Sequence, residues 1–225
     1  MPEIHPTHPS PLSRALNRVR TRGLAEVGSL LWTRMRETVA SDDELVVFVQ
    51  SSGGRMELPS GLTFRAADAS DAEAYARDIG TDSSESFRER LSASTHCFLV
   101  LQGRLIVHSS WVTTSSAWTR EIRGYMVPPA RGAYVYESFT RPEVRGRGVY
   151  PLALRAICDW AGGEQIEQVW VAVEADNPAS IRAVTKAGFE EAFRFSYRRR
   201  LGRLKIDPPT GQMAQIGTSF VRRTQ

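Results

Sequence analysis

The residues best suited to chemistry stand in one short stretch, Arg145-Gly146-Arg147-Gly148-Val149-Tyr150-Pro151. Proline lacks a backbone N–H, so inside a helix it fits best in the first turn, where donors are unpaired anyway. Pro151 therefore predicts a helix that begins close to Gly148. The free N–H groups of that helix end would lie beside the positive pole of the helix dipole, and the two glycines leave room for a ligand. The stretch predicts a cradle for a diphosphate.

Two common nucleotide motifs are excluded. A dinucleotide fingerprint, GxGxxG, would need a glycine where Pro151 stands, and no GK[ST] sequence is present for a phosphate-binding loop. A second polar motif, Asn177-Pro178-Ala179-Ser180, opens a later helical stretch that ends at Ala187-Gly188-Phe189. Asn followed by Pro is also an ordinary helix start, with the Asn side chain as N-cap.

The elements that must position these motifs follow from periodicity and from turn residues. A helix is predicted over 148–161, directly after a strand over 133–139. The other predicted strands are 62–66, 96–101, 105–114, 118–127 and 168–173, with a final extended segment over 189–201, and the other predicted helices are 71–79, 83–93 and 177–187. Gln102-Gly103-Arg104 indicates a hairpin. This order predicts an α/β fold with a mixed, mostly antiparallel central sheet flanked by helices.

We divide the chain into three parts. Residues 1–61 form an N-terminal extension: a Pro- and His-rich start expected to be disordered, a helical pattern from Leu12 to about Val39, a strand from Leu45 to Gln50, and a linker. Residues 62–201 form the core domain. Residues 202–225 form a basic C-terminal tail, for which a solvated segment is the simplest reading.

Composition excludes several classes of protein. Of the 225 residues 41% are hydrophobic and 24% charged, too apolar for a disordered chain. No apolar run reaches the ~18 residues of a membrane span. The two cysteines, Cys97 and Cys158, exclude a disulfide framework and a four-cysteine zinc site. We expect a cytoplasmic protein without a metal. The net charge of +4 is concentrated at the chain ends, so no nucleic-acid partner is expected.

The combination of motifs resembles the GNAT superfamily of acyl-CoA-dependent N-acyltransferases. The resemblance rests on R-x-x-G at Arg145–Gly148 between strand and helix, then N-P-A-S at Asn177–Ser180, then A-G-F at Ala187–Phe189. It covers the core but neither residues 1–60 nor the tail. It implies a GNAT fold in which acetyl-CoA lies between two diverging strands, 134–139 and 168–173. The implied cofactor-binding residues are Phe139, Thr140, Val144, Arg145, Gly146, Arg147, Gly148, Val149, Asn177 and Ser180.

Two positions depart from the family pattern. Tyr150 stands where the family has a small residue, so its phenol must point away from the phosphates or lie along the cofactor or acceptor channel. Val184 stands where the family often has a tyrosine that protonates the departing thiolate. Candidate replacements are Tyr150, Tyr136 and Ser180, and departure of the thiolate without help is an alternative, because thiols are acidic.

Glu137 is the candidate general base, because a carboxylate within an apolar strand is costly unless it is paired or useful. The structural alternative is a buried salt bridge with Arg123 or Arg141. Tyr134 and Tyr136 alternate with Glu137 and are expected on the other side of the strand, either lining an acceptor pocket or within the core. His96 and His108 are expected to be structural.

The predicted function is transfer of an acetyl group from acetyl-CoA to a primary amine of a small molecule, by direct attack in a ternary complex. Glu137 and Tyr150 are the predicted catalytic residues, and backbone amides would polarise the thioester carbonyl. A longer acyl-CoA or an acyl-carrier donor, and a catalytically silent CoA-binding domain, are the alternatives. The acceptor and a homodimer stay open.

Overall fold

The computed structural model describes residues 40–54, 57–200 and 203–223. These residues form an eight-stranded sheet in the order β10-β9-β1-β8-β7-β4-β3-β2, in which only β7 and β8 are parallel neighbours. Its strands are β1 (Ala40–Ser51), β2 (Leu62–Ala66), β3 (Thr95–Gln102), β4 (Leu105–Thr113), β7 (Gly132–Thr140), β8 (Gln168–Glu174), β9 (Glu190–Arg200) and β10 (Arg203–Ile206). The mixed, mostly antiparallel sheet predicted from the sequence is confirmed.

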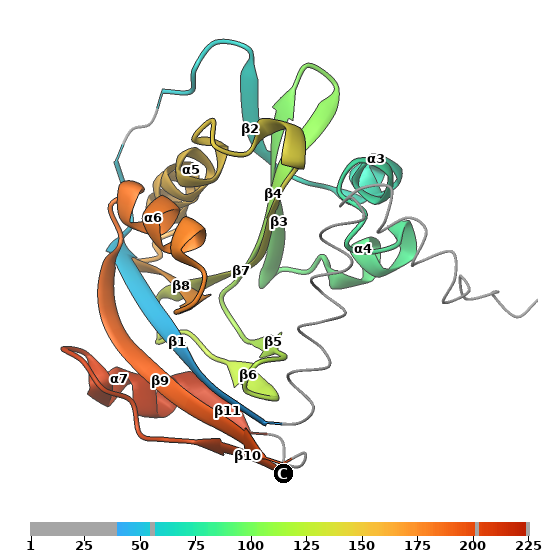
Figure 1. Ribbon diagram of the computed structural model, residues 1–225. Coiled ribbons are helices and arrows are strands. Elements are labelled where there is room, and N and C mark those ends of the chain that lie inside the picture. The colour runs from blue at the N-terminus through green and yellow to red at the C-terminus, as the bar shows by residue number, and fades with distance from the viewer. Residues whose placement is uncertain (1–39, 55–56, 201–202, 224–225) are drawn as a thin grey trace, which may run out of the picture.

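Helices cover both faces of this sheet (Figure 1). One face carries α5 (Val149–Gly163) and α6 (Pro178–Lys186). The other face carries the short turn η1 (Ala69–Asp71), α3 (Ala72–Asp78), α4 (Ser84–Arg90), α7 (Ala214–Phe220) and a three-stranded sheet of β5 (Ala117–Thr119), β6 (Gly124–Met126) and β11 (Val221–Arg223). The turn η2 (Pro142–Val144) joins β7 to α5.

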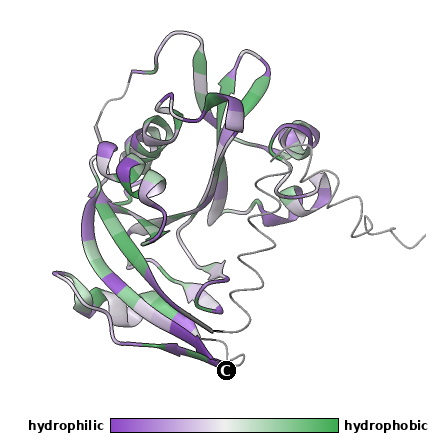
Figure 2. Ribbon diagram, in the orientation of Figure 1, coloured by the Kyte–Doolittle hydropathy of each residue, from purple (hydrophilic) through white to green (hydrophobic). Residues whose placement is uncertain are grey.

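Strand β1 lies inside the sheet although the sequence places it in the extension before residue 62. It pairs antiparallel with β8 on one side and with β9 on the other. Val46 and Phe48 pack in the α5 and α6 core, whereas Leu45 and Val47 pack in the core beneath α7. Burial on both faces explains the unbroken apolar run of this strand, coloured as hydrophobic in Figure 2.

Two segments differ from expectation. Residues 118–127 were expected to form one strand, but β5 and β6 form a short hairpin, because the chain turns between them at Arg123, whose φ is 44°. The tail expected to be solvated folds back instead: β10 pairs with β9, β11 pairs with β6, and Phe220 is buried. The expected disordered start and the helix over residues 12–39 lie outside the described residues.

Candidate active site

The parallel pair at the centre of the sheet opens partway along its length. β7 and β8 are paired from Gly132 and Gln168 to Val135 and Val171. Beyond this point β7 continues to Thr140 and β8 to Glu174 without pairing to each other, while β7 stays paired to β4 on its other side. The last residues of β7 therefore present an open strand edge, to which an extended ligand can hydrogen-bond like an added strand.

A β-bulge lies where this opening begins. Ser109 pairs with Phe139 and Trp111 with Tyr136, so one residue of β4 faces two residues of β7, Glu137 and Ser138. Glu137 adopts a φ of 46°, a left-handed conformation that is rare for a residue other than glycine. The extra residue shifts the alternation of side chains along the strand.

The bulge changes which side chains share a face. Tyr136 and Phe139 pack with the α3 and α4 core, and Ser138 and Thr140 face α5. Strict alternation would have placed Glu137 on the side opposite Tyr136. Instead its carboxylate contacts Arg90 at the end of α4, so the expected separation of Glu137 from Tyr136 is wrong.

Glu137 is less buried than its apolar strand suggests. Its side chain is 52% exposed, and its carboxylate lies 2.8 Å from the Arg90 guanidinium. The ion pair therefore involves Arg90 instead of Arg123 or Arg141. Arg141 donates to the Asp78 carbonyl at 2.8 Å and pairs with Glu143.

Arg90 is a site residue that the sequence analysis missed. Its guanidinium lies 3.9 Å from the centroid of the Trp111 ring and 2.5 Å from the Asp82 carboxylate, and it hydrogen-bonds Tyr136. Burial opposes its charge, but the Glu137 and Asp82 carboxylates outweigh burial and raise the pKa of Arg90. No local pattern marks this arginine, because its partners lie on other elements.

The helix end beside the opening has the geometry of an anion cradle. Gly146 and Gly148 have φ values of 77° and 78°, and a Cβ added to either would meet no atom within 4 Å. Gly148 is the N-cap of α5 and provides no side-chain cap, and Pro151 is the third helical residue. The start of α5 therefore has room beside its glycines and no side-chain cap on its first N–H groups, and together with the helix dipole this fits a diphosphate.

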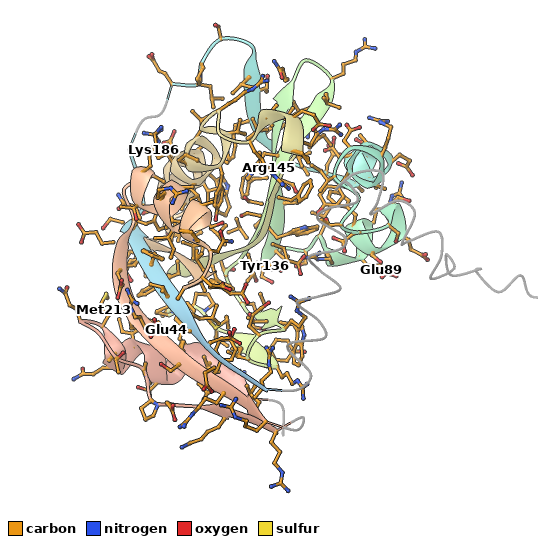
Figure 3. All side chains as sticks on the ribbon, in the orientation of Figure 1. Glu44, Glu89, Tyr136, Arg145, Lys186 and Met213 are labelled. Carbon is orange, nitrogen blue, oxygen red and sulfur yellow. The ribbon has the colours of Figure 1, made fainter. Side chains whose placement is uncertain are left out.

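The cradle is tied to the open strand edge. Arg145 Nε donates to the Thr140 carbonyl at 3.1 Å, and Val144 and Val149 are buried beneath the loop. Figure 3 shows Arg145 beside the start of α5 and Tyr136 below it, nearer the centre of the molecule. The predicted residues from Phe139 to Val149 thus lie on one continuous segment that runs from the open strand edge to the helix end.

Tyr150 points from α5 toward the sheet. Its ring centroid lies 5.5 Å from that of His108, and its phenol hydrogen-bonds Ser138. The phenol therefore points toward β4 and β7 and away from the N–H groups at the start of α5. Burial raises the pKa of Tyr150 to about 12, so the phenol keeps its proton near neutral pH.

The second predicted motif opens α6. The Asn177 side chain accepts a hydrogen bond from the Ser180 backbone at 3.1 Å, which makes it an N-cap, with Pro178 as the first helical residue. A contact of Asn177 or Ser180 with the cofactor stays a prediction. Val184 is fully buried in the core and offers no proton.

Two surface hollows lie elsewhere. One is lined by residues around Glu174 and the other by residues around Ile181, both beside β1 and β9. Neither is lined by Glu137, Tyr150 or the glycines of the cradle. These two hollows therefore do not coincide with the candidate site, which is defined by the strand opening and the start of α5.

A central sheet that opens between parallel strands, with an uncapped glycine-rich helix start beside the opening, is the arrangement that the resemblance implies for an acyltransferase. The sequence matches the family model described as "Acetyltransferase (GNAT) domain" over residues 39–190. The chain belongs to this family and is a GNAT N-acetyltransferase. The match includes β1, the strand that lies between β8 and β9.

The chain is similar to several solved structures, and the first one named here shares its fold. A GCN5-related N-acetyltransferase from Sphaerobacter thermophilus matches with a TM-score of 0.54 and 14% identity, over 80% of this chain and 58% of that chain. An aminoglycoside acetyltransferase from an uncultured soil metagenomic sample, in complex with sisomicin, matches with a TM-score of 0.47 and 13% identity. The match covers 58% of this chain and 90% of that chain. The ribosomal-protein-S18-alanine N-acetyltransferase from Escherichia coli matches with a TM-score of 0.46 and 17% identity, over 58% of this chain and 79% of that chain.

A search of curated proteins finds no match to the chain. Across the described part of the chain, every helix is too short or too polar to span a membrane.

Proposed function

We propose that the protein transfers an acetyl group from acetyl-CoA to a primary amine of a small molecule. The observation that carries this proposal is the bulge at Glu137, because it separates two chemical groups onto the two faces of the opened sheet. The carboxylate lies on the α4 face, and Ser138 with the Tyr150 phenol lies on the α5 face. An acyl donor held in the opening would then have a proton acceptor on one side and a proton donor on the other.

The diphosphate of the donor is assigned to the N–H groups of Gly148, Val149 and Tyr150. The pantetheine arm is assigned to the open edge of β7 near Phe139 and Thr140, with Asn177 on the opposite side. This placement uses the uncapped helix end and the strand edge that β8 leaves unpaired.

The proposed reaction is a direct displacement. The amine nitrogen attacks the thioester carbonyl carbon, Glu137 takes the proton that the nitrogen loses, and the carbon–sulfur bond breaks. The Tyr150 phenol gives its proton to the departing sulfur. Arg90 pairs with both Glu137 and Asp82, and two carboxylates against one guanidinium favour the approach of a cationic amine.

A two-part experiment tests this proposal. Thermal unfolding is measured with and without acetyl-CoA, and release of CoA thiol is then measured over a panel of amines and of acyl-CoA donors of increasing chain length. We expect acetyl-CoA to raise the melting temperature and to be the preferred donor. Preference for a longer acyl chain would contradict the acetyl assignment.

The role of Glu137 is tested by Glu137→Gln, with Glu89→Gln on α4 as an exposed control. Loss of a general base lowers turnover by about 10²- to 10⁴-fold. We expect kcat to fall into this range in Glu137→Gln while the acetyl-CoA melting shift stays unchanged, and Glu89→Gln to keep full activity. An unchanged kcat in Glu137→Gln would remove Glu137 from the mechanism.

A further inference from the structure

A buried row of polar side chains crosses β4 and β7 behind Tyr150. His108 is fully buried, its Nδ1 lies 2.7 Å from Thr140 Oγ1, and its Nε2 lies 2.9 Å from Ser110 Oγ. Ser110 Oγ lies 2.8 Å from Ser138 Oγ, and Ser138 hydrogen-bonds the Tyr150 phenol. These contacts connect Thr140 to Ser138 through His108 and Ser110, and Tyr150 lies at the Ser138 end, with its ring centroid 5.5 Å from that of His108. His108 is the one imidazole among these five residues.

His108 is neutral in this setting, because burial lowers its pKa to about 3. A neutral imidazole has one N–H and one bare nitrogen, so its tautomer decides which neighbour receives a hydrogen bond and which gives one. Each hydroxyl in the row has a single proton. With the proton on Nδ1, the single proton of each hydroxyl makes every hydrogen bond in the row point toward His108, whereas with the proton on Nε2 the row can point toward Tyr150.

The two tautomers leave Tyr150 in opposite states. With the proton on Nδ1, His108 donates to Thr140 and accepts from Ser110, which accepts from Ser138, which accepts from the Tyr150 phenol. The phenol proton is then held inside the row. With the proton on Nε2, His108 donates to Ser110, which leaves the Ser110 proton available for Ser138 and the Ser138 proton available for the phenol oxygen. In that arrangement the phenol proton is free to point outward.

We infer that His108 is a positioning residue for Tyr150: in its Nε2–H tautomer, through Ser110 and Ser138, it directs the phenol proton outward toward the departing thiolate. This inference rests on the proposed role of Tyr150 as proton donor. The same arrangement stabilises the phenolate that remains after donation, because Ser138 donates to its oxygen. In the step itself one proton moves from the phenol to the sulfur, and the phenolate later regains a proton from water; His108 and both serines keep their proton counts.

The sharpest test cuts the row at Ser110. Ser110→Ala removes one oxygen and breaks the link between His108 and Ser138. Ser109→Ala is the matched control, because Ser109 is the neighbouring buried serine of β4 and its Oγ has no hydrogen-bond partner among the described residues. We expect Ser110→Ala to lower kcat by about tenfold with the KM for acetyl-CoA unchanged, and Ser109→Ala to leave both unchanged.

Repeating the measurement in a Tyr150→Phe background shows whether the effect passes through Tyr150. We expect Ser110→Ala to have no further effect there, because the group that it positions is gone. The same kcat loss in both backgrounds, or no loss in the wild-type background, would overturn the inference. If Tyr150→Phe alone left kcat unchanged, the proposed proton donor would fail instead, so the two failures are distinguishable.

A conservative pair of variants provides a second test. The amide of His108→Gln reaches the position of Nε2 and can still donate to Ser110, whereas the shorter amide of His108→Asn reaches only the position of Nδ1. We expect His108→Gln to retain severalfold more activity than His108→Asn. Equal activity of two folded variants, or greater activity of His108→Asn, would overturn the inference.

Discussion

The guanidinium of Arg90 lies 2.8 Å from the carboxylate of Glu137. These residues are far apart in the sequence, and the contact exists because the bulge in β7 turns Glu137 toward the end of α4. The Arg90 guanidinium also lies 3.9 Å from the centroid of the Trp111 ring, a cation–π contact. The candidate base is therefore held by an arginine that is itself held by a ring and a second carboxylate.

Arg90→Met is expected to destabilise the fold by about 2 kcal/mol, because it removes charged hydrogen bonds from a mostly buried group and leaves two carboxylates facing each other. The control is Arg88→Met on the same helix, whose ion pair with Glu73 is largely exposed. That pair should contribute little to stability, because solvent screens an exposed ion pair. Urea denaturation measures both variants, and equal losses would contradict the structural role assigned to Arg90.

Gly148→Ala tests the anion cradle. The left-handed φ of 78° disfavours alanine, and the added methyl group projects into the space assigned to the diphosphate. The KM for acetyl-CoA should rise roughly tenfold or more. Acetylpantetheine, which lacks the diphosphate, should be used equally well by the variant and the wild type.

Gly163→Ala serves as the control for this substitution, because Gly163 lies at the far end of α5 with open space around it. It should leave both KM values unchanged and add up to about 1 kcal/mol of stability. Steady-state kinetics gives the KM of each variant for acetyl-CoA and for acetylpantetheine. An equal rise in KM for both donors would mean that Gly148→Ala distorts the site without affecting a phosphate subsite.

The buried His108 predicts a loss of stability in mild acid. Its pKa falls from 6.5 to about 3 on folding, so between these values the unfolded chain binds a proton that the folded chain does not. The stability contributed by the neutral ring is therefore complete above the unfolded pKa and is lost as pH falls toward the folded one. The slope is at most about 1.4 kcal/mol per pH unit for one group.

His108→Gln removes this titration. Unfolding free energies measured between pH 7 and pH 4.5 should fall with pH in the wild type and stay flatter in the variant. Parallel curves would show that His108 does not titrate on unfolding. The interval stops at pH 4.5 to limit the contribution of carboxylates.

Phe220→Ala tests whether the C-terminal segment belongs to the core. The Phe220 ring is buried and lies 5.3 Å from the Trp170 ring and 5.5 Å from the Phe193 ring, measured between centroids. Removing it should cost about 3–5 kcal/mol. Thr218→Ala on the exposed side of α7 should change stability by less than about 0.5 kcal/mol. Thermal unfolding of the two variants tests this, and similar melting temperatures would argue for a loosely attached tail.

Local patterns in the sequence determined the elements and the start of the cradle helix. The run Leu62–Ala66 is a strand with the bounds predicted for it, and Pro151 placed the beginning of α5 within a residue of where it lies. Both depend on interactions between near neighbours, such as alternating burial and the missing N–H of proline. The candidate cofactor residues from Phe139 to Val149 followed from the same local signals together with the family resemblance.

Only the tertiary structure decided which distant residues meet. The place of β1 between β8 and β9 depends on strand pairing, and an apolar run carries no information about its partner. The bulge at Glu137 depends on the register between β4 and β7, and the contact with Arg90 depends on that bulge. His108, which by itself suggested a structural residue, joins Tyr150 only because the two strands and α5 bring five polar groups into one row. Hydrogen bonds and ion pairs of this kind act over a few ångströms in space, and separation along the chain does not encode them.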